Sequence, residues 1–165
     1  MKEMISYGIM IGLICAVASG ILARVNFIQA QVESDLAEFL PEATRFEPVS
    51  SNGTIIYYKG YDKDNRLIGA VFKAAGKGYS SVIETMAGMT RDGKITSIKV
   101  ISLNETAGVG SRVTEPGFTG QFSGKAIRQL PSVQAITGAT ISSSAVINSV
   151  AQKAQELTEM LKNEK

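Results

Sequence analysis

The sequence predicts an α+β domain built on an antiparallel sheet and preceded by one membrane-spanning helix. Three observations predict this class: two β-hairpin patterns follow one another, helical patterns flank them, and an uncharged apolar run opens the chain. Hairpins bracketed by helices favour an antiparallel sheet with helices packed on it. We divide the 165 residues into an N-terminal tail (1–4), a transmembrane helix (5–23), a helical connector (24–52) and one domain (53–165).

The first predicted element is a membrane anchor from Ile5 to Ala23, which carries no formal charge. As a helix it would be about 28 Å long, close to the thickness of the bilayer hydrocarbon. A cleaved signal peptide is the alternative, because Ala16-Val17-Ala18 resembles a small-residue cleavage site. The apolar run continues through Leu22, which is longer than a signal peptide requires, so we expect an uncleaved anchor.

Periodicity and turn residues predict the remaining elements in order. Apolar residues at helical spacing predict a short helix from Ile28 to Leu40, which Pro41 ends. Two hairpins follow, with turns at Asp62–Asn65 and Asp92-Gly93. Their strands are expected over Thr54–Gly60, Leu67–Ala74, Ser81–Thr90 and Ile95–Leu103. A glycine-rich connection (Asn104–Gly124), a short strand (Val133–Thr137) and an amphipathic helix (Ser144–Leu161) complete the domain.

Composition excludes several kinds of chemistry. Histidine is absent, which removes histidine bases, catalytic triads and histidine metal sites. The single cysteine, Cys15, lies in the apolar run, so neither a disulfide nor a thiolate metal cluster is expected. A net charge of +2 without a basic stripe gives no reason to expect nucleic-acid binding. We therefore expect no catalytic side chain and no metal, so any redox role requires an organic cofactor.

The most informative stretch is Thr137-Gly138-Ala139-Thr140, which stands just before the last helix, with Ser142 and Ser143 after it. A helix start offers free backbone N–H groups and the positive end of the helix dipole, which together hold a phosphate. Gly138 and Ala139 leave the approach open, and Thr140 places a hydroxyl where that phosphate would lie. The alternative is that these residues only cap the helix, as Ser and Thr commonly do.

A second candidate is the loop Glu105-Thr106-Ala107-Gly108-Val109-Gly110. Two glycines this close together let the backbone approach a flat ligand. An ordinary surface loop would explain them equally well. The loop is no dinucleotide fingerprint, because it lacks the third glycine and opens no helix. Together with the helix start, it would form the second half of one pocket.

These motifs, in this order, resemble the FMN-binding domain family, whose members include the G subunit of the Rnf ion-translocating complex and the C subunit of the sodium-pumping NADH:quinone reductase. Thr137 to Thr140 resembles the family's flavinylation motif, Ser/Thr-Gly-Ala-Thr. Three further stretches, Gly76–Tyr79, Glu105–Gly110 and Phe118–Lys125, are similar to family motifs in order and spacing. The resemblance covers about Ile5 to Leu157. This chain departs from the family at Gln134, where Asp is usual, at Ala107 and Val109, where Pro and Leu are usual, and at Ser80, where many relatives have Trp.

The resemblance implies that the domain over 53–165 binds FMN, attached by a phosphoester to Thr140. It implies a candidate cofactor site composed of Tyr79, Glu105, Thr106, Gly108, Val109, Gly110, Arg112, Thr137, Gly138, Ala139, Thr140, Ser142 and Ser143. Lys125 and Arg128 are, with Arg112, candidates to lie near the remaining phosphodiester charge. A separate flavin transferase would perform the attachment.

The implied function is that of an electron-transfer subunit in an Rnf-type membrane complex, which relays electrons between redox subunits and is coupled to ion transport. The expected location is the cell (inner) membrane, with a single span in contact with lipid and the domain on the periplasmic or outer side. Gly8, Gly12, Ala16 and Gly20 recur along one face of the anchor, which favours packing against partner subunits. The alternative function is a membrane-anchored binding or assembly subunit that carries no electrons.

Overall fold

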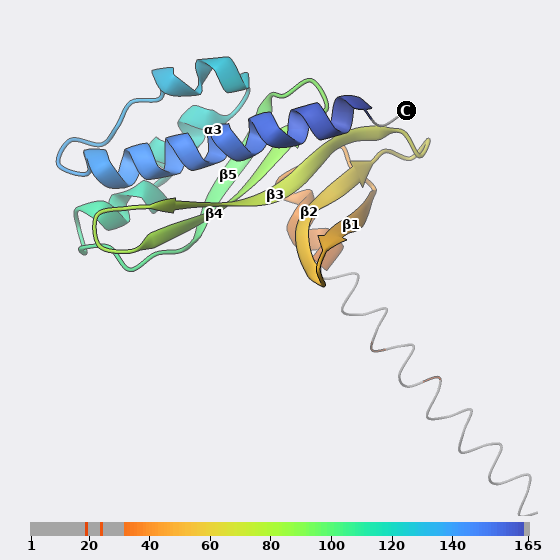
Figure 1. The fold of residues 1–165 in the computed structure, drawn as a ribbon, viewed down its shortest axis with the longest axis horizontal. Coiled ribbons are helices and arrows are strands. Elements are labelled where there is room, and N and C mark those ends of the chain that lie inside the picture. Colours follow the sequence, from red (N-terminus) through yellow and green to blue (C-terminus); the bar gives the residue numbers. More distant parts are fainter. Residues whose placement is uncertain (1–18, 20–23, 25–31, 164–165) are drawn as a thin grey trace, which may run out of the picture. The chain divides into compact units, whose positions relative to one another are not determined.

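The computed structural model describes Ser19, Arg24 and residues 32–163 (Figure 1). The chain divides into two units, residues 1–35 and 36–165, and the strands and helices named below belong to the second. Among the described residues, no helix is both long and apolar enough to cross a membrane. The anchor predicted from Ile5 to Ala23 lies outside the described residues, apart from Ser19, and stays a prediction.

The second unit is built on a five-stranded antiparallel sheet in which every strand pairs with the next along the chain. The strands are β1 (Arg45–Ser51), β2 (Thr54–Tyr61), β3 (Leu67–Lys77), β4 (Val82–Thr90) and β5 (Ile95–Ser102). The four strands predicted from the two hairpins are therefore confirmed, and β3 extends beyond Ala74 to Lys77. This extension carries β3 up to the turn that borders the candidate site.

β1 was not predicted from the sequence, because residues 24–52 were expected to form a helical connector. Its sequence has no clean alternation and contains Pro48, which an edge strand tolerates. Asn52 and Gly53 join β1 to β2 with positive φ angles of 52° and 78°. An Asn-Gly pair in this conformation is a strong hairpin signal, and it would have identified β1.

A short helical segment, which the boundary between the two units divides, comes before β1 in the chain. Residues 32–37 are helical, and the helix ends at a turn over 38–39, before Pro41. The helix predicted from Ile28 to Leu40 is thus present over part of its range, and its expected beginning lies outside the described residues. After Leu36, the buried side chains of Phe39, Leu40 and Ala43 cluster with Val71 of β3.

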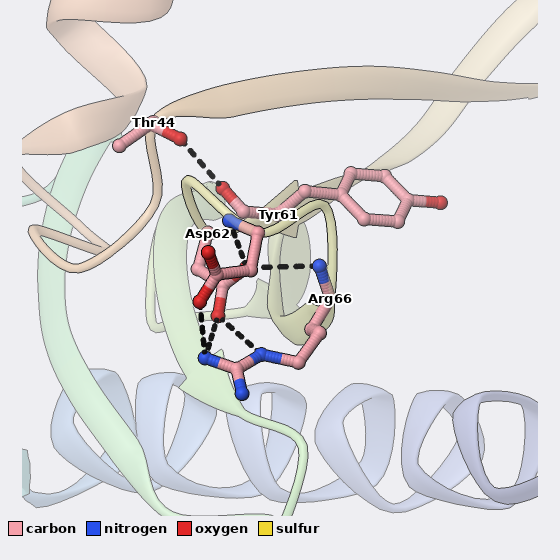
Figure 2. Close-up of polar contacts among 5 residues, drawn as sticks. Thr44, Tyr61, Asp62 and Arg66 are labelled. Carbon is pink, nitrogen blue, oxygen red and sulfur yellow. Dashed lines mark hydrogen bonds and ion pairs between the residues drawn. The ribbon is translucent and has the colours of Figure 1, made fainter.

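The turn between β2 and β3 is held by Asp62, as its turn-forming sequence predicts. Figure 2 shows the Asp62 carboxylate accepting hydrogen bonds from the backbone N–H and the Nε of Arg66, each at 2.9 Å. The hydrogen bond from the Arg66 backbone is the main reason why the pKa of Asp62 lies below its ordinary value. Thr44 adds a hydrogen bond from its hydroxyl to the Tyr61 carbonyl at 3.3 Å.

The glycine-rich connection folds into three short turns of helix, η1 (Gly110–Thr114), α2 (Pro116–Thr119) and η2 (Gly120–Phe122), and a fourth, η3 (Ile127–Ser132), follows it. The strand predicted over Val133–Thr137 is wrong, because this segment is irregular. Its backbone N–H groups bind side chains instead of a neighbouring strand: Gln134 donates to Gln121 Oε1 and Ile136 to Ser143 Oγ. The segment therefore has fixed contacts without belonging to the sheet.

The last element, α3 (Thr140–Asn163), packs along β3 and β4 (Figure 1). Its core-facing side chains Val146, Val150, Ala154, Leu157 and Leu161 have no exposed surface. Burying each of the larger ones contributes about 1.5–3 kcal/mol to stability. This apolar stripe fixes α3 on the sheet, so its N-terminal end has a defined position beside the loop that follows β5.

Candidate functional site

The first turn of α3 forms one side of the candidate site. Ser143 donates its backbone N–H to the Ala139 carbonyl at 2.9 Å, so Thr140 is the first helical residue. The predicted start at Ser144 is therefore too late, because the serines were interpreted as residues that precede the helix. The N–H groups of Thr140, Ile141 and Ser142 have no acceptor within the helix. No hydrogen bond between described residues engages them.

Gly138 makes the sharp turn that leads into α3. Its φ is +84°, a conformation that residues with a side chain rarely adopt. Ala139 is buried and closes the turn by donating its N–H to the Ile136 carbonyl at 2.9 Å. Thr140, in contrast, is exposed. The local sequence thus presents the Thr140 hydroxyl to solvent at the positive end of the helix.

Glu105 connects three separate parts of the site. Its carboxylate accepts backbone N–H bonds from Tyr79 (3.2 Å), Ser80 (3.0 Å) and Ser81 (2.9 Å), all in the turn between β3 and β4. It also accepts hydroxyl bonds from Ser81 (3.2 Å) and, on α3, from Ser142 (2.7 Å). The loop after β5, the β3–β4 turn and the start of α3 are therefore held together by one carboxylate.

The hydrogen bonds of Glu105 determine its ionisation. Burial of the carboxylate raises its pKa, but the hydrogen bonds from Ser142 and from the backbone of Ser81, Ser80 and Tyr79 outweigh burial and lower the pKa from 4.5 to about 2. Glu105 is consequently ionised throughout the physiological range. Its negative charge is stabilised by neutral donors, because these five hydrogen bonds come from backbone N–H groups and serine hydroxyls.

Gly110 leaves room for this carboxylate. A Cβ at Gly110 would lie 2.8 Å from Glu105 Oε2 and 3.0 Å from Ser142 Oγ. Both distances are shorter than ordinary contacts, so a side chain here would displace the Glu105–Ser142 hydrogen bond. Gly110 was predicted to let the backbone approach the ligand closely. In the structure it lets the backbone approach the Glu105 side chain.

The three parts enclose a pocket of about 370 Å³, which is within the usual size range of small-molecule sites. Exposed apolar side chains on its walls are Tyr79 (72% exposed), Val109 (44%) and Ile141 (55%). Its lining is Tyr79, Glu105, Thr106, Val109, Gly110, Gly138, Ala139, Thr140, Ile141 and Ser142. Ile141 is the lining residue that was not predicted, although its place directly after Thr140 and off the apolar stripe of the last helix was a usable signal.

Four predicted site residues lie elsewhere. Ser143 is buried, and its hydroxyl accepts the Ile136 N–H at 3.1 Å. Gly108 does not line the pocket, although it lies in the same loop. Thr137 and Arg112 instead line a neighbouring groove of about 330 Å³, where Arg112 pairs with Glu115 at 3.4 Å.

Among the residues that the structure describes, no cationic side chain lines the pocket. Lys125 and Arg128, suggested with Arg112 as partners of a phosphodiester, are not among the residues that line it. The positive end of α3 and its free N–H groups are the features that suit an anionic ester. Tyr79, Val109 and Ile141 suit a flat aromatic ring. The residues present therefore fit a flavin whose phosphate lies at the start of α3.

Comparisons with known proteins identify the family of this chain. A model of the FMN-binding domain family matches residues 78–155, which include both halves of the pocket. The chain is 32% identical to the G subunit of the ion-translocating oxidoreductase complex of Methanosarcina acetivorans, covering 90% of this chain and 92% of the relative. It is 33% identical to the G subunit of the proton-translocating ferredoxin:NAD(+) oxidoreductase complex of Clostridium ljungdahlii, over 87% and 86% of the two chains.

Two solved structures share the fold. NqrC of Shewanella oneidensis aligns with a TM-score of 0.56 at 21% identity, covering 73% of this chain and 72% of its own. The C subunit of the Na(+)-translocating NADH-quinone reductase of Parabacteroides distasonis aligns with a TM-score of 0.57 at 17% identity, covering 74% and 80%. At these identities the likeness supports the fold alone.

Proposed function

This chain belongs to the FMN-binding domain family, among the G subunits of ion-translocating oxidoreductase complexes, and from that premise we propose that it carries FMN covalently on Thr140 and transfers electrons within such a complex. FMN is the cofactor of the domain over residues 78–155. When bound, it supplies reversible electron transfer, which no side chain of this chain offers. The chain's own residues position the group and shield it.

The observation that carries the covalent proposal is the exposed Thr140 hydroxyl at the first position of α3, inside a pocket that no Lys or Arg lines. A free phosphate in this pocket would be held by N–H groups alone and would lie near the negative charge of Glu105. A phosphoester to Thr140 keeps the group in place without a cationic partner. The dipole of α3 then stabilises the single remaining negative charge.

The proposed attachment is a phosphoryl transfer from a flavin dinucleotide. A bond forms between Thr140 Oγ and the phosphorus of the FMN half, the pyrophosphate bond breaks, and a nucleoside monophosphate leaves with the bonding electron pair. The hydroxyl proton is released, so the protein gains FMN less one water. This step requires a flavin transferase, because Glu105 is a poor base at a pKa of about 2 and the chain has no histidine.

Intact-mass measurement tests this proposal. The full-length chain, coexpressed with a flavin transferase, is expected to gain the mass of FMN less water. Thr140→Ser is expected to retain the modification and Thr140→Ala to lose it. Thr114→Ala is the matched control, since Thr114 is an exposed threonine that is not among the residues lining the pocket or the neighbouring groove. An unmodified wild-type chain, or a modified Thr140→Ala chain, would overturn covalent attachment at this residue.

The similarity to G subunits also supports a place for the chain in a membrane complex. Its partners would be the other redox and membrane subunits, between which electrons are relayed while an ion is transported. We propose that residues 5–23 anchor the chain in the cell membrane and that the domain faces the periplasmic or outer side. Flavin absorbance of the purified chain, separated from its partners, distinguishes this role from that of an assembly subunit without an electron-carrying function.

A further inference from the structure

The segment Gln134–Thr137, just before the attachment turn, packs against the core through Ile136 and makes few hydrogen bonds. It lies between the buried side chains of Val133 and Ala139 and pairs with no strand. Its contact with α3 is the bond from the Ile136 N–H to Ser143 Oγ. Among the described residues, Gln121 is the only other side chain that donates to or accepts from this segment.

The side-chain amide of Gln121 forms hydrogen bonds with both the backbone N–H and the backbone carbonyl of Gln134. Its Oε1 accepts the Gln134 N–H at 2.9 Å, and its Nε2 donates to the Gln134 carbonyl at 3.4 Å. Nε2 also donates to the Gly117 carbonyl at 3.2 Å. The side chain amide thereby fixes the direction of the Gln134 backbone in the way that a strand partner would.

The base of this contact is rigid. Gln121 lies in η2 next to Phe122, and the preceding short helix α2 contains Phe118. The two phenylalanine side chains are buried and pack edge to face, with ring centroids 5.5 Å apart. Because its neighbours are fixed in the core, Gln121 has little freedom to follow a displaced Gln134 segment.

The held segment forms one wall of the 330 Å³ groove. The groove is lined by Gln134, Ala135, Ile136 and Thr137 on one side and includes Arg112, Glu115 and Gln121. It shares no lining residue with the 370 Å³ cofactor pocket. The chain therefore passes from the groove into the pocket across Gly138, and an enzyme that modifies Thr140 meets this exposed polar groove beside its target.

We infer that Gln121 is a positioning residue for flavin attachment: it fixes the backbone of Gln134 so that the groove wall formed by residues 134–137 has the shape that the attaching enzyme engages. The inference rests on the proposed covalent attachment at Thr140. Because Thr140 itself belongs to α3 and is held by the helix, loss of Gln121 disturbs the engagement of the acceptor and not the reacting hydroxyl. The consequence is a higher KM for the acceptor chain at unchanged kcat.

Steady-state flavinylation of the full-length chain tests the inference, with a purified flavin transferase and a flavin dinucleotide as donor. The Gln121→Ala variant is expected to raise the apparent KM by about two- to tenfold, the range that corresponds to one ordinary hydrogen bond. Its kcat is expected to stay within about twofold of the wild type, since the transition state at Thr140 is unaffected.

Two further variants separate positioning from general stability. Gln121→Glu retains an acceptor for the Gln134 N–H but replaces the Nε2 donor by an oxygen that faces the carbonyls of Gln134 and Gly117, so it is expected to raise KM at least as much as Gln121→Ala. Gln129→Ala is the matched control, because Gln129 Oε1 accepts a similar 2.9 Å bond from the Ala126 N–H in the same connection. Gln129→Ala is expected to lower stability comparably and to leave KM unchanged.

The KM values of these variants decide whether Gln121 positions the acceptor segment. A rise in KM confined to the Gln121 variants supports the inference. An unchanged KM in Gln121→Ala, an equal rise in Gln129→Ala, or a loss in kcat with KM unchanged would each overturn it. A wild-type chain that accepts no flavin would overturn the proposed function itself, and is thereby distinguished from failure of the Gln121 inference.

Discussion

The carboxylate of Glu105 accepts five hydrogen bonds, so Glu105→Gln is the most informative test of how the pocket is held together. The substitution keeps the size of the side chain and one acceptor oxygen. If the amide nitrogen takes the place of Oε2, it faces the Tyr79 N–H, which is also a donor, and Ser142 Oγ at 2.7 Å. The variant therefore loses charge-assisted hydrogen bonds to both the β3–β4 turn and α3.

The expected loss of folding stability in Glu105→Gln follows from the pKa of Glu105. A folded-state pKa near 2, against an ordinary value of 4.5, sets an upper limit of about 3 kcal/mol on the stabilisation by the ionised carboxylate. Solvent screening reduces this to about 1–2 kcal/mol, because the carboxylate is partly exposed. For a chain of this length, the expected fall in Tm is about 2–8 °C.

The stability difference between the wild type and Glu105→Gln depends on pH. The folded-state pKa is depressed, so the stabilisation is fully present above the unfolded value of about 4.5 and is lost as the pH falls toward 2. Chemical denaturation at pH 7, 5 and 3 is expected to show the wild-type advantage over Glu105→Gln shrinking at the lowest pH. Glu156→Gln is the control, since it removes a surface ion pair with Lys153 and is expected to cost less than about 1 kcal/mol. Equal stability of wild type and Glu105→Gln at pH 7, or a difference that grows on acidification, would show that the ionised carboxylate does not hold the pocket together.

Three other substitutions test separate parts of the chain. Thr85→Val removes a buried hydroxyl that has no hydrogen-bond partner in the described part of the chain, so urea denaturation is expected to show a gain of about 0.5–1 kcal/mol; a loss would contradict this. Gly110→Ala places a Cβ 2.8 Å from Glu105 Oε2 and is expected to destabilise the domain by about 1–3 kcal/mol, with unchanged stability as the contrary result. Gly12→Leu combined with Ala16→Leu is expected to release the chain from its complex while FMN stays attached; stoichiometric copurification of the double variant would show that this face does not pack against a partner.

The hairpin strands were predictable from sequence because alternation and turn residues act locally. β2 to β5 follow such patterns, and the Asn52-Gly53 pair carried the same kind of information for β1. The predicted strand over Val133–Thr137 failed for a different reason. A short apolar run forms a strand only where an edge is free to pair, and here the partners are the side chains of Gln121 and Ser143.

The candidate site was predictable as a set of segments but not as a set of contacts. Motif spacing identified Thr140 and the loop from Glu105, because these residues lie in short stretches with recognisable chemistry. The role of Glu105 depends on the approach of the β3–β4 turn and α3, which are distant in sequence. The resemblance implies that Glu105 belongs to the cofactor site, whereas both of its carboxylate oxygens accept hydrogen bonds from the protein itself.

Attachment of FMN to Thr140 can be tested without any substitution, by fragmentation mass spectrometry of the tryptic peptide 129–153 from the chain in its native complex. This peptide also contains Thr137 and the serines at the start of α3, so it distinguishes the proposed residue from its neighbours. We expect FMN less one water on Thr140 alone. An unmodified peptide, or a flavin located on Thr137 or Ser142, would contradict attachment at Thr140.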